Sequence, residues 1–274
     1  MTSAAIGYTG TIWLNRAVAA TPTEARMKSM LVAILVALAA PPAWAASAPP
    51  IVRKTPNLAK DAEAFPTLVG ATTAIARINR ALQAANAEQL DEMKDCLRDA
   101  PQDGYWWEQD VETPLLGARF VSFWTHGNDS CGGAHPNFIS EALVFDLRTG
   151  ERVDWKTLLP AELRGKPGRA LDGTPLPPDE IASPAATALF IAESEKEGVG
   201  ADCKEAFAEQ EMHFELWPDA KAKGLAMRAA NLLHWAEGPC SGPATIPLAT
   251  LKQLGVNPAL IQDIETGSYQ VQNY

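Results

Sequence analysis

The residues whose types allow chemistry are concentrated in one polar, Gly-rich segment, residues 126–137. The segment contains three side chains of types that bind metal ions, His126, Asp129 and His135. The segment also offers Ser130 or Cys131 as a nucleophile that His135 could activate as a base. It lacks a nucleophile elbow and an oxyanion-hole motif, and its metal-ligand types are not fixed on a predicted helix. We therefore expect a hydrogen-bonding loop with no metal, no cofactor and no catalytic residues. A metal site and a hydrolytic site are the alternatives.

The elements on either side of this segment have the pattern of central strands. Strands are predicted over residues 120–125 and 138–145, which carry apolar residues on both faces and are therefore expected to be covered on both faces. A tight turn follows at residues 148–150, where Gly150 can adopt the positive φ that a hairpin requires. The twelve residues between the strands exceed what a hairpin needs, so we expect a long loop there. Long ordered loops are often functional.

Two motifs in this region carry a family resemblance. Residues 131–137 (CGGAHPN) and 144–150 (VFDLRTG) resemble the signature of an extracytoplasmic domain family of unknown function. That family includes the sensor half of the RsiV anti-sigma factor, which binds lysozyme, and the non-catalytic N-terminal part of the deacetylase PdaC. The resemblance covers roughly residues 60–255 and is most specific in these two motifs. It implies an α+β sensor or binding fold and supplies no established catalytic residues.

The rest of the sequence predicts an α+β fold, in which a mostly antiparallel sheet packs with a long N-terminal helix and two to four shorter helices. The long helix is predicted over residues 72–98, because Ile75, Ile78 and Leu82 begin an apolar series at helical spacing and Pro101 marks its end. Shorter helices are predicted over residues 154–159, 184–197 (with Ser183 as N-cap), 202–208 and 247–255, and further strands over residues 105–111, 212–216, 225–232 and 245–246.

The N-terminal part has the pattern of a signal segment. Lys28 precedes an apolar run over residues 30–40, and small residues at 43 and 45 form a cleavage site. We expect cleavage after Ala45, with the mature chain in the periplasm or secreted. The apolar run is too short to span a bilayer as a helix, so no stable membrane anchor is expected, the alternative being an uncleaved anchor.

The expected organisation follows from these patterns. Its parts are a signal segment, residues 1–45 (with 1–26 a spurious extension if Met27 is the initiator), a mobile Pro-rich linker, 46–60, the α+β domain, 61–255, and a C-terminal tail, 256–274. An alternative is that the domain consists of two closely packed halves that divide near residue 160.

Four cysteines are expected to form disulfides. They are Cys96, Cys131, Cys203 and Cys240. An even number in an exported chain is typical of disulfide bonding, and the spacing of a zinc site is absent. Of the three pairings we favour Cys96–Cys131 and Cys203–Cys240, because each joins neighbours within one half of the fold. A closed loop of this length contributes about 4 kcal/mol in the chain-entropy model.

The charge of the mature chain limits its partners. Residues 1–45 hold three of the 23 basic residues and one of the 33 acidic residues, so cleavage leaves 20 basic and 32 acidic residues and a net charge of −12. Such a chain has no electrostatic attraction to nucleic acid or to anionic lipid, and it attracts basic partners.

Resemblance and charge together predict a non-catalytic exported binding or sensing domain for a basic protein ligand of the lysozyme type. The residues expected to contact the ligand are Asn128, Asp129, Ser130, Gly132, Gly133, His135 and Asn137. The alternative is a cell-wall module that binds peptidoglycan, with Trp106 and Trp107 as a sugar platform, or a hydrolase that uses the loop from His126 to His135.

Overall fold

Two antiparallel four-stranded sheets organise the part of the chain that the structure, a computed structural model, describes. That part comprises residues 49–99, 104–132, 135–165, 175–176, 179–208, 211–232, 236 and 240–270. It belongs to one unit, Ala45–Tyr274, and the predicted signal segment lies outside the described residues. None of the described helices combines the length and the apolar character that a bilayer span requires.

The first sheet has the strand order β10-β3-β4-β5. Its strands are β3 (Tyr105–Leu116), β4 (Phe120–Cys131), β5 (Asn137–Asp146) and β10 (Ser268–Gln270). Alternate residues of β4 face opposite sides: Phe123 packs edge-on against Phe65 in the core under α1 (Thr73–Asp99), while Trp124 stacks on Trp217 of the second sheet. Both faces of this sheet are therefore covered near its centre, as the sequence predicts.

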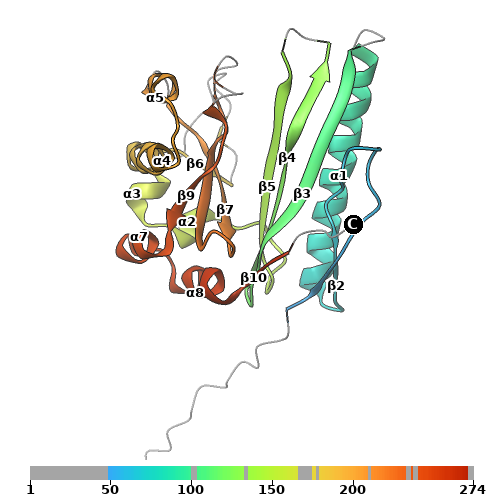
Figure 1. Ribbon diagram of the computed structural model, residues 1–274. Coiled ribbons are helices and arrows are strands. Elements are labelled where there is room, and N and C mark those ends of the chain that lie inside the picture. Colours follow the sequence, from blue (N-terminus) through green and yellow to red (C-terminus); the bar gives the residue numbers. More distant parts are fainter. Residues whose placement is uncertain are drawn as a thin grey trace, which may run out of the picture. The chain divides into compact units, whose positions relative to one another are not determined.

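The second sheet has the order β6-β7-β8-β9, and helices cover its far face. Its strands are β6 (Glu180–Ile181), β7 (Phe214–Asp219), β8 (Gly224–Ala229) and β9 (Ala244–Pro247). Phe190 of α4 (Pro184–Lys196) packs 5.1 Å from Phe214, on the side of β7 opposite Trp217. The described chain therefore has four layers: α1, the first sheet, the second sheet, and a group of shorter helices (Figure 1).

The shorter elements follow local sequence signals. The remaining elements are β1 (Ile51–Arg53), β2 (Thr67–Val69), α2 (Trp155–Leu158), α3 (Ala161–Arg164), α5 (Ala201–Ala208), α7 (Leu248–Gln253) and α8 (Pro258–Thr266). The side chains of Asp154 and Ser183 accept N-cap hydrogen bonds at α2 and α4, and Pro184 occupies the first turn of α4. The α+β class and the predicted long helix are confirmed.

Both disulfides have the pairing that the sequence favours. Cys96, near the end of α1, is bonded to Cys131, the last residue of β4, and Cys203 of α5 is bonded to Cys240. Their Cα–Cα separations, 4.8 and 5.4 Å, lie in the usual range for disulfides. Such bonds are typical of proteins in oxidising compartments.

The predicted twelve-residue loop is wrong. Residues 126–131 continue β4: all six pair with β3, and residues 126–129 also pair with β5, so the connection is reduced to residues 132–136. The polar side chains in this part of β4 suggested a loop, but they lie where one face of the sheet is exposed to solvent. Backbone pairing on both sides of the strand outweighs the low strand propensity of glycine, asparagine and aspartate.

The boundaries of the domain also differ from the prediction. Residues 256–270 do not form a tail: Leu260 and Ile264 of α8 are fully buried, and β10 pairs with β3. The carboxylate of Asp263 accepts hydrogen bonds from the backbone N–H groups of Arg119 and Phe120. The predicted linker is shorter as well, because β1 pairs with β2.

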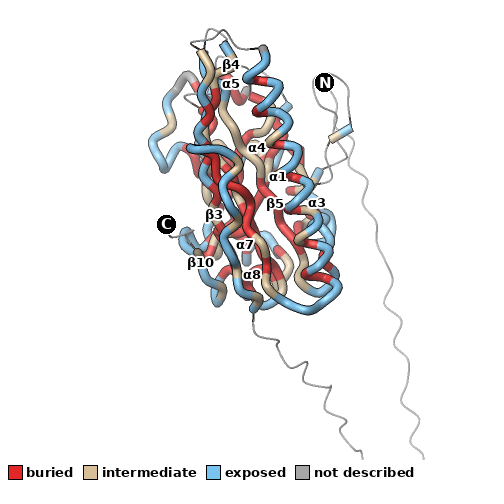
Figure 2. The backbone as a smooth tube through the Cα atoms, turned by 90° about the vertical axis from the view of Figure 1, so that its right-hand side faces the viewer, coloured by how far each residue is buried: buried red, intermediate tan, exposed pale blue. Residues whose placement is uncertain are grey.

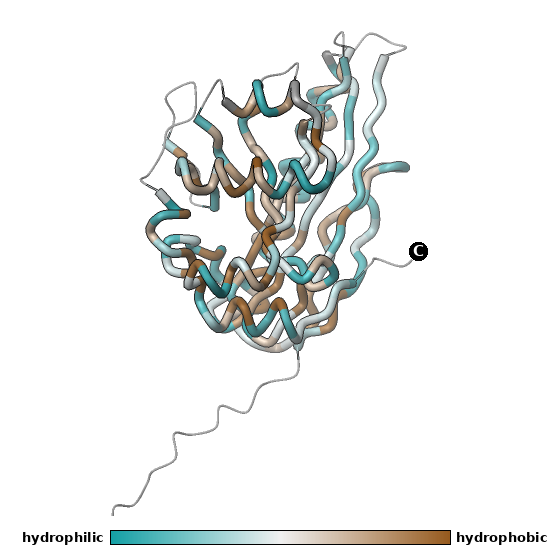
Figure 3. Tube along the Cα trace, turned by 60° about the vertical axis from the view of Figure 1, so that its left-hand side comes forward, coloured by the Kyte–Doolittle hydropathy of each residue, from teal (hydrophilic) through white to brown (hydrophobic). Residues whose placement is uncertain are grey.

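Burial and hydropathy differ along the first sheet. Buried residues follow the strands and the inner side of α1, whose outer side is exposed (Figure 2). In Figure 3 the strand ends at the top of the view are teal to white, whereas the brown, hydrophobic segments gather lower in the molecule. The upper end of the sheet is therefore the polar end, and it contains the segment singled out from the sequence.

Candidate functional site

The candidate site is the polar end of the first sheet, hereafter the distal end: residues 105–112 of β3, 126–131 of β4 and 137–141 of β5. In Figure 1 it is the upper end of these strands, which extends past the described strands of the second sheet. We call the side that faces α1 the helix face, and the opposite side the open face. Strand alternation assigns each side chain of the distal end to one of the two.

The residues predicted to contact a ligand divide between these faces. Asn128 and Ser130 share the open face with Trp124, whereas Asp129 lies on the helix face with Phe123. At the end of the hairpin, Gly132 has φ +86°, a conformation that glycine adopts without strain. His135 is exposed, Asn137 begins β5, and Gly133 lies outside the described residues. The expected single loop surface is thus replaced by two sides of a hairpin.

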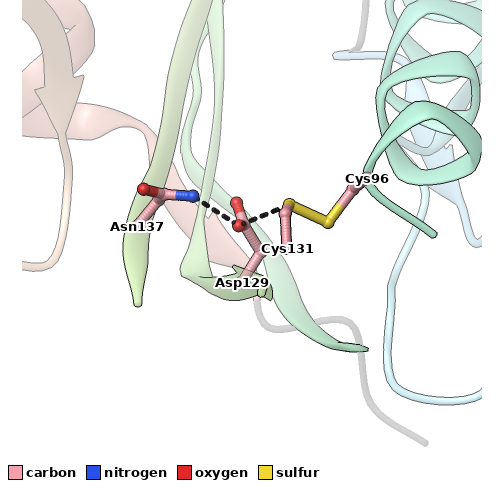
Figure 4. The surroundings of a disulfide bond; sticks show 4 residues. All are labelled: Cys96, Asp129, Cys131 and Asn137. Atoms are coloured by element: carbon pink, nitrogen blue, oxygen red, sulfur yellow. Dashed lines mark hydrogen bonds between the residues drawn. A yellow bond between two sulfur atoms is a disulfide. The ribbon is translucent and has the colours of Figure 1, made fainter. Parts of the chain in front are cut away.

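On the helix face, Asp129 is held at the disulfide. Its side chain is buried, with 7% exposed, and its Oδ1 accepts a hydrogen bond of 2.8 Å from Asn137 Nδ2 (Figure 4). The same oxygen lies 3.2 Å from Cys131 Sγ, a contact without a proton because the sulfur is bonded to Cys96. Burial raises the pKa of Asp129, and the hydrogen bond from Asn137 opposes that rise.

A pocket of about 350 Å³ adjoins Asp129 between α1 and β5. It is lined by Glu88, Gln89, Glu92, Trp107, Asp129, Phe138, Ile139, Ser140 and Glu141. Four of these residues are carboxylates, and no lysine or arginine is among them. Burial raises the pKa of Glu141 to about 7, against the opposing effect of Arg152, and burial together with Glu88 and Asp129 raises that of Glu92. The pocket therefore favours a cationic group.

The open face is also acidic, and it carries an exposed aromatic ring. Trp106, Glu108, Asp110 and Glu112 alternate along β3, and Trp106 has 38% of its surface exposed. Glu112 lies 3.6 Å from His126, whose hydrogen bond is the main cause of the lowered pKa of Glu112. The His126 ring packs 4.3 Å from Trp124, at the point where the second sheet begins to cover the first.

Sequence reasoning missed the acidic residues of β3 and the pocket. The acidic residues of β3 could have been predicted from the sequence. Acidic residues at 108, 110 and 112 alternate with Trp107, Gln109 and Val111, which is the pattern of a strand with one solvated face. The pocket could not have been predicted in this way, because its acidic residues come from three elements that are separate in the sequence, α1, β4 and β5.

The geometry separates the residues proposed for metal binding or hydrolysis. His126 and Asp129 point to opposite faces of β4. Among the described residues, the side chains grouped closely enough to hold a metal ion are Cys96, Asp129 and Cys131, and two of them are consumed by the disulfide. For the same reason Cys131 is not available as a nucleophile.

A second group of buried charges lies between the sheets, below the open face. Glu215 of β7 accepts hydrogen bonds from Ser140 of β5 and from Arg228 of β8, and burial raises its pKa despite the opposing charge of Arg228. Burial, with Glu215 and Asp179, raises the pKa of Glu180 to about 7. Because these contacts connect the two sheets, we assign this group a structural role and not a role in ligand binding.

The fold and the site define an α+β domain with an acidic, disulfide-tied sheet end. No protein-family model matches the sequence, and no curated protein matches it. Among solved structures, the chain is similar to a member of the DUF3298 family from Bacteroides fragilis, with 13% identity and a TM-score of 0.48. The match covers 79% of this chain and 95% of that one.

Proposed function

We propose that this chain is an exported binding domain that recognises a basic protein through the distal end of its first sheet. The observation that carries the proposal is the distribution of charge at that end. Its acidic residues, with those of the adjoining pocket, are Glu88, Glu92, Glu108, Asp110, Glu112, Asp129 and Glu141. The three strand segments of the distal end contain no lysine or arginine. A patch of one sign of charge speeds encounter with an oppositely charged partner and selects against others.

Two further features support a protein ligand. Trp106 places an exposed indole ring beside Glu108 on the open face, and tryptophan is enriched among the residues that dominate binding energy. The Cys96–Cys131 bond fixes the tip of the hairpin to α1. A surface that is held rigid before binding loses less conformational entropy when the complex forms.

Lysozyme is the partner that the sequence resemblance suggests, and calorimetry tests it. The mature chain is titrated with chicken-type lysozyme at low and at moderate salt. A variant with Glu108→Gln and Asp110→Asn is compared with a control that loses two exposed acidic residues elsewhere, Glu162→Gln and Glu197→Gln. We expect the dissociation constant to rise about tenfold in the first variant, which is ~1.4 kcal/mol, and to change little in the control.

Three outcomes would each overturn one part of the proposal, namely the ligand, the specific acidic patch or the use of the open face. An absence of heat at micromolar concentrations excludes this ligand. Equal weakening in both variants means that only net charge matters. Binding that is unchanged in the Glu108 and Asp110 variant places the site away from the open face.

Trp106 also supports a second candidate, recognition of a cell-wall glycan. An exposed indole ring is a common platform for sugars as well as for proteins. Soluble peptidoglycan fragments in the same calorimetric experiment separate the two, since they lack the positive charge of lysozyme. Glycan binding that is lost in Trp106→Ala but unaffected by salt would favour this second function.

A further inference from the structure

The outer edge of β5 carries backbone groups at the distal end that no described residue engages in a hydrogen bond. β5 is the last strand of its sheet, and its even-numbered residues point outward: Val144 O accepts from Val153 N, and Ala142 O accepts from Arg152. The pairing of β5 with β4 is regular, so the N–H and C=O groups of Phe138 and Ser140 also point outward. Within the described part of the chain, no hydrogen bond engages these four groups.

The acidic pocket opens beside this edge. Phe138 and Ser140 line it, although the Phe138 ring lies under Arg228 and the Ser140 hydroxyl is bonded to Glu215 on the other side of the strand. The backbone of β5 therefore forms this wall of the pocket. Ile139 and Glu141 project into it from β5, and Glu88 and Glu92, one helical turn apart, face it from α1.

We propose that this edge accepts an extended peptide segment as an added strand, with a lysine or arginine side chain of that segment seated in the acidic pocket. The inference rests on the proposed function only in that the partner is basic. It names a different contact surface, the β5 edge and the helix face, from the open face of β3.

Sheet geometry connects the two halves of the proposal. Residues directly opposite each other on neighbouring strands project to the same face of the sheet. A residue opposite Ile139 or Glu141 on an added strand therefore projects toward α1, into the pocket. Backbone hydrogen bonds to Phe138 and Ser140 provide affinity without sequence preference, and the pocket supplies specificity, the division of roles that is general for strand addition.

The lining of the pocket suits a long basic side chain. The ring of Trp107 and the side chain of Ile139 offer apolar surface for its methylene groups, and the carboxylates of Glu92, Asp129 and Glu141 offer acceptors for its head. The contacts that Glu141 already makes are long, a hydrogen bond of 3.4 Å from Gln89 and an ion pair of 4.0 Å with Arg152, so a closer donor can compete with them.

Amide exchange on the mature chain tests strand addition. The probe is a capped pentapeptide, Thr-Arg-Thr-Arg-Thr, and its controls are the same peptide with N-methylated arginine or threonine backbones and a peptide with glutamate in place of arginine. We expect exchange at Phe138 and Ser140 to slow when the probe binds, while Ile139 and Glu141, whose amides already point to β4, keep their rates. Alternate residues of the added strand direct their backbone N–H groups toward β5. We therefore expect binding to be lost in only one of the two N-methylated peptides, the one in which methyl groups replace the protons that face β5.

Charge variants test the pocket. The double variant Glu92→Gln, Glu141→Gln is expected to weaken the probe about fivefold, and the open-face variant Glu108→Gln, Asp110→Asn is expected to leave it nearly unchanged. Slowed exchange at other amides, equal effects of both variants, or no binding at millimolar probe would overturn the inference. Lysozyme binding that depends on Glu108 and Asp110 alone would leave the proposed function standing and reject this docking mode.

Discussion

At the scale of single residues, partly buried carboxylates give the protein a stability that depends on pH. Glu141 and Glu180 each have a pKa of about 7 in the folded chain, compared with an ordinary value of 4.5, and burial is the main cause for both. A carboxyl whose pKa is raised by folding binds more protons in the folded state than in the unfolded state. Its stabilising contribution is complete below pH 4.5 and is lost as the pH rises to about 7.

We therefore expect the free energy of unfolding to fall between pH 5 and pH 8 by about 2 kcal/mol, after a discount for solvent screening at the half-exposed Glu141. Urea unfolding over this range measures it. Glu180→Gln should flatten the profile and raise stability at pH 8, while Glu162→Gln, on the exposed side of α3, should keep the wild-type slope. A profile that rises with pH would show that these carboxyls are not held protonated.

Residue-level signals predicted helix starts better than they predicted the site. Ser183 and Pro184 start α4 because capping needs only local hydrogen bonds and a fixed φ. Asn128 and Asp129 are predicted to act together because the sequence indicates a single loop that contains both. In a strand, neighbours point to opposite faces, so the same two residues belong to different surfaces.

At the scale of elements, the disulfide between α1 and β4 sets the rigidity of the distal end. It closes 35 residues, including the whole of β3, and the Cys203–Cys240 bond closes a loop of nearly equal length, 37 residues. Chain entropy alone therefore predicts the same loss for removal of either bond, about 4 kcal/mol.

We expect a Cys96→Ser, Cys131→Ser variant to unfold at lower urea concentration and, unlike the matched Cys203→Ser, Cys240→Ser variant, to exchange amides faster at residues 126–131 and 137–141. Urea titration and exchange mass spectrometry measure the two effects. Equal exchange at the distal end in both variants would contradict a local stiffening role for the first bond.

The polar half of β4 shows why the element pattern was only partly predictable. Phe120 to Thr125 has apolar residues on both faces and is recognisable as a strand. Beyond it, His126, Asn128 and Ser130 face solvent or a polar surface, and Gly127 and Asp129 are unusual in strands. At Gly127 a Cβ would come within 1.9 Å of Glu108 O, so glycine is required there by the close approach of β3, which the sequence does not display.

At the scale of the whole molecule, the C-terminal residues complete the larger buried core, which includes the contact between the two sheets. Leu260 and Ile264 belong to the same buried cluster as Trp217 and Phe120, and β10 adds the outer strand beside β3. The sequence holds a signal for α8, since Asn257 caps it and Pro258 occupies its first turn, but the residues after Gly255 were interpreted as a tail.

We expect a mature chain that ends at Gly255 to lose cooperative unfolding, because it exposes the partners of two fully buried side chains, each worth about 2–5 kcal/mol. A chain that ends at Gln270 should melt like the full protein. Circular dichroism melting compares them, and a cooperative transition of unchanged midpoint in the shorter chain would contradict the assignment of residues 256–270 to the core.

The Cys96–Cys131 bond has one more consequence, for how the first sheet is assembled. Cys131 can meet Cys96 only while it faces α1, and a slip of β4 by a single residue would turn it to the opposite side of the sheet. The disulfide can therefore form in the native hairpin but not in the hairpin whose register is shifted by one residue. In an oxidising compartment we therefore expect this bond to form after β3 and β4 have reached their native alignment, and to stabilise that alignment once it has formed.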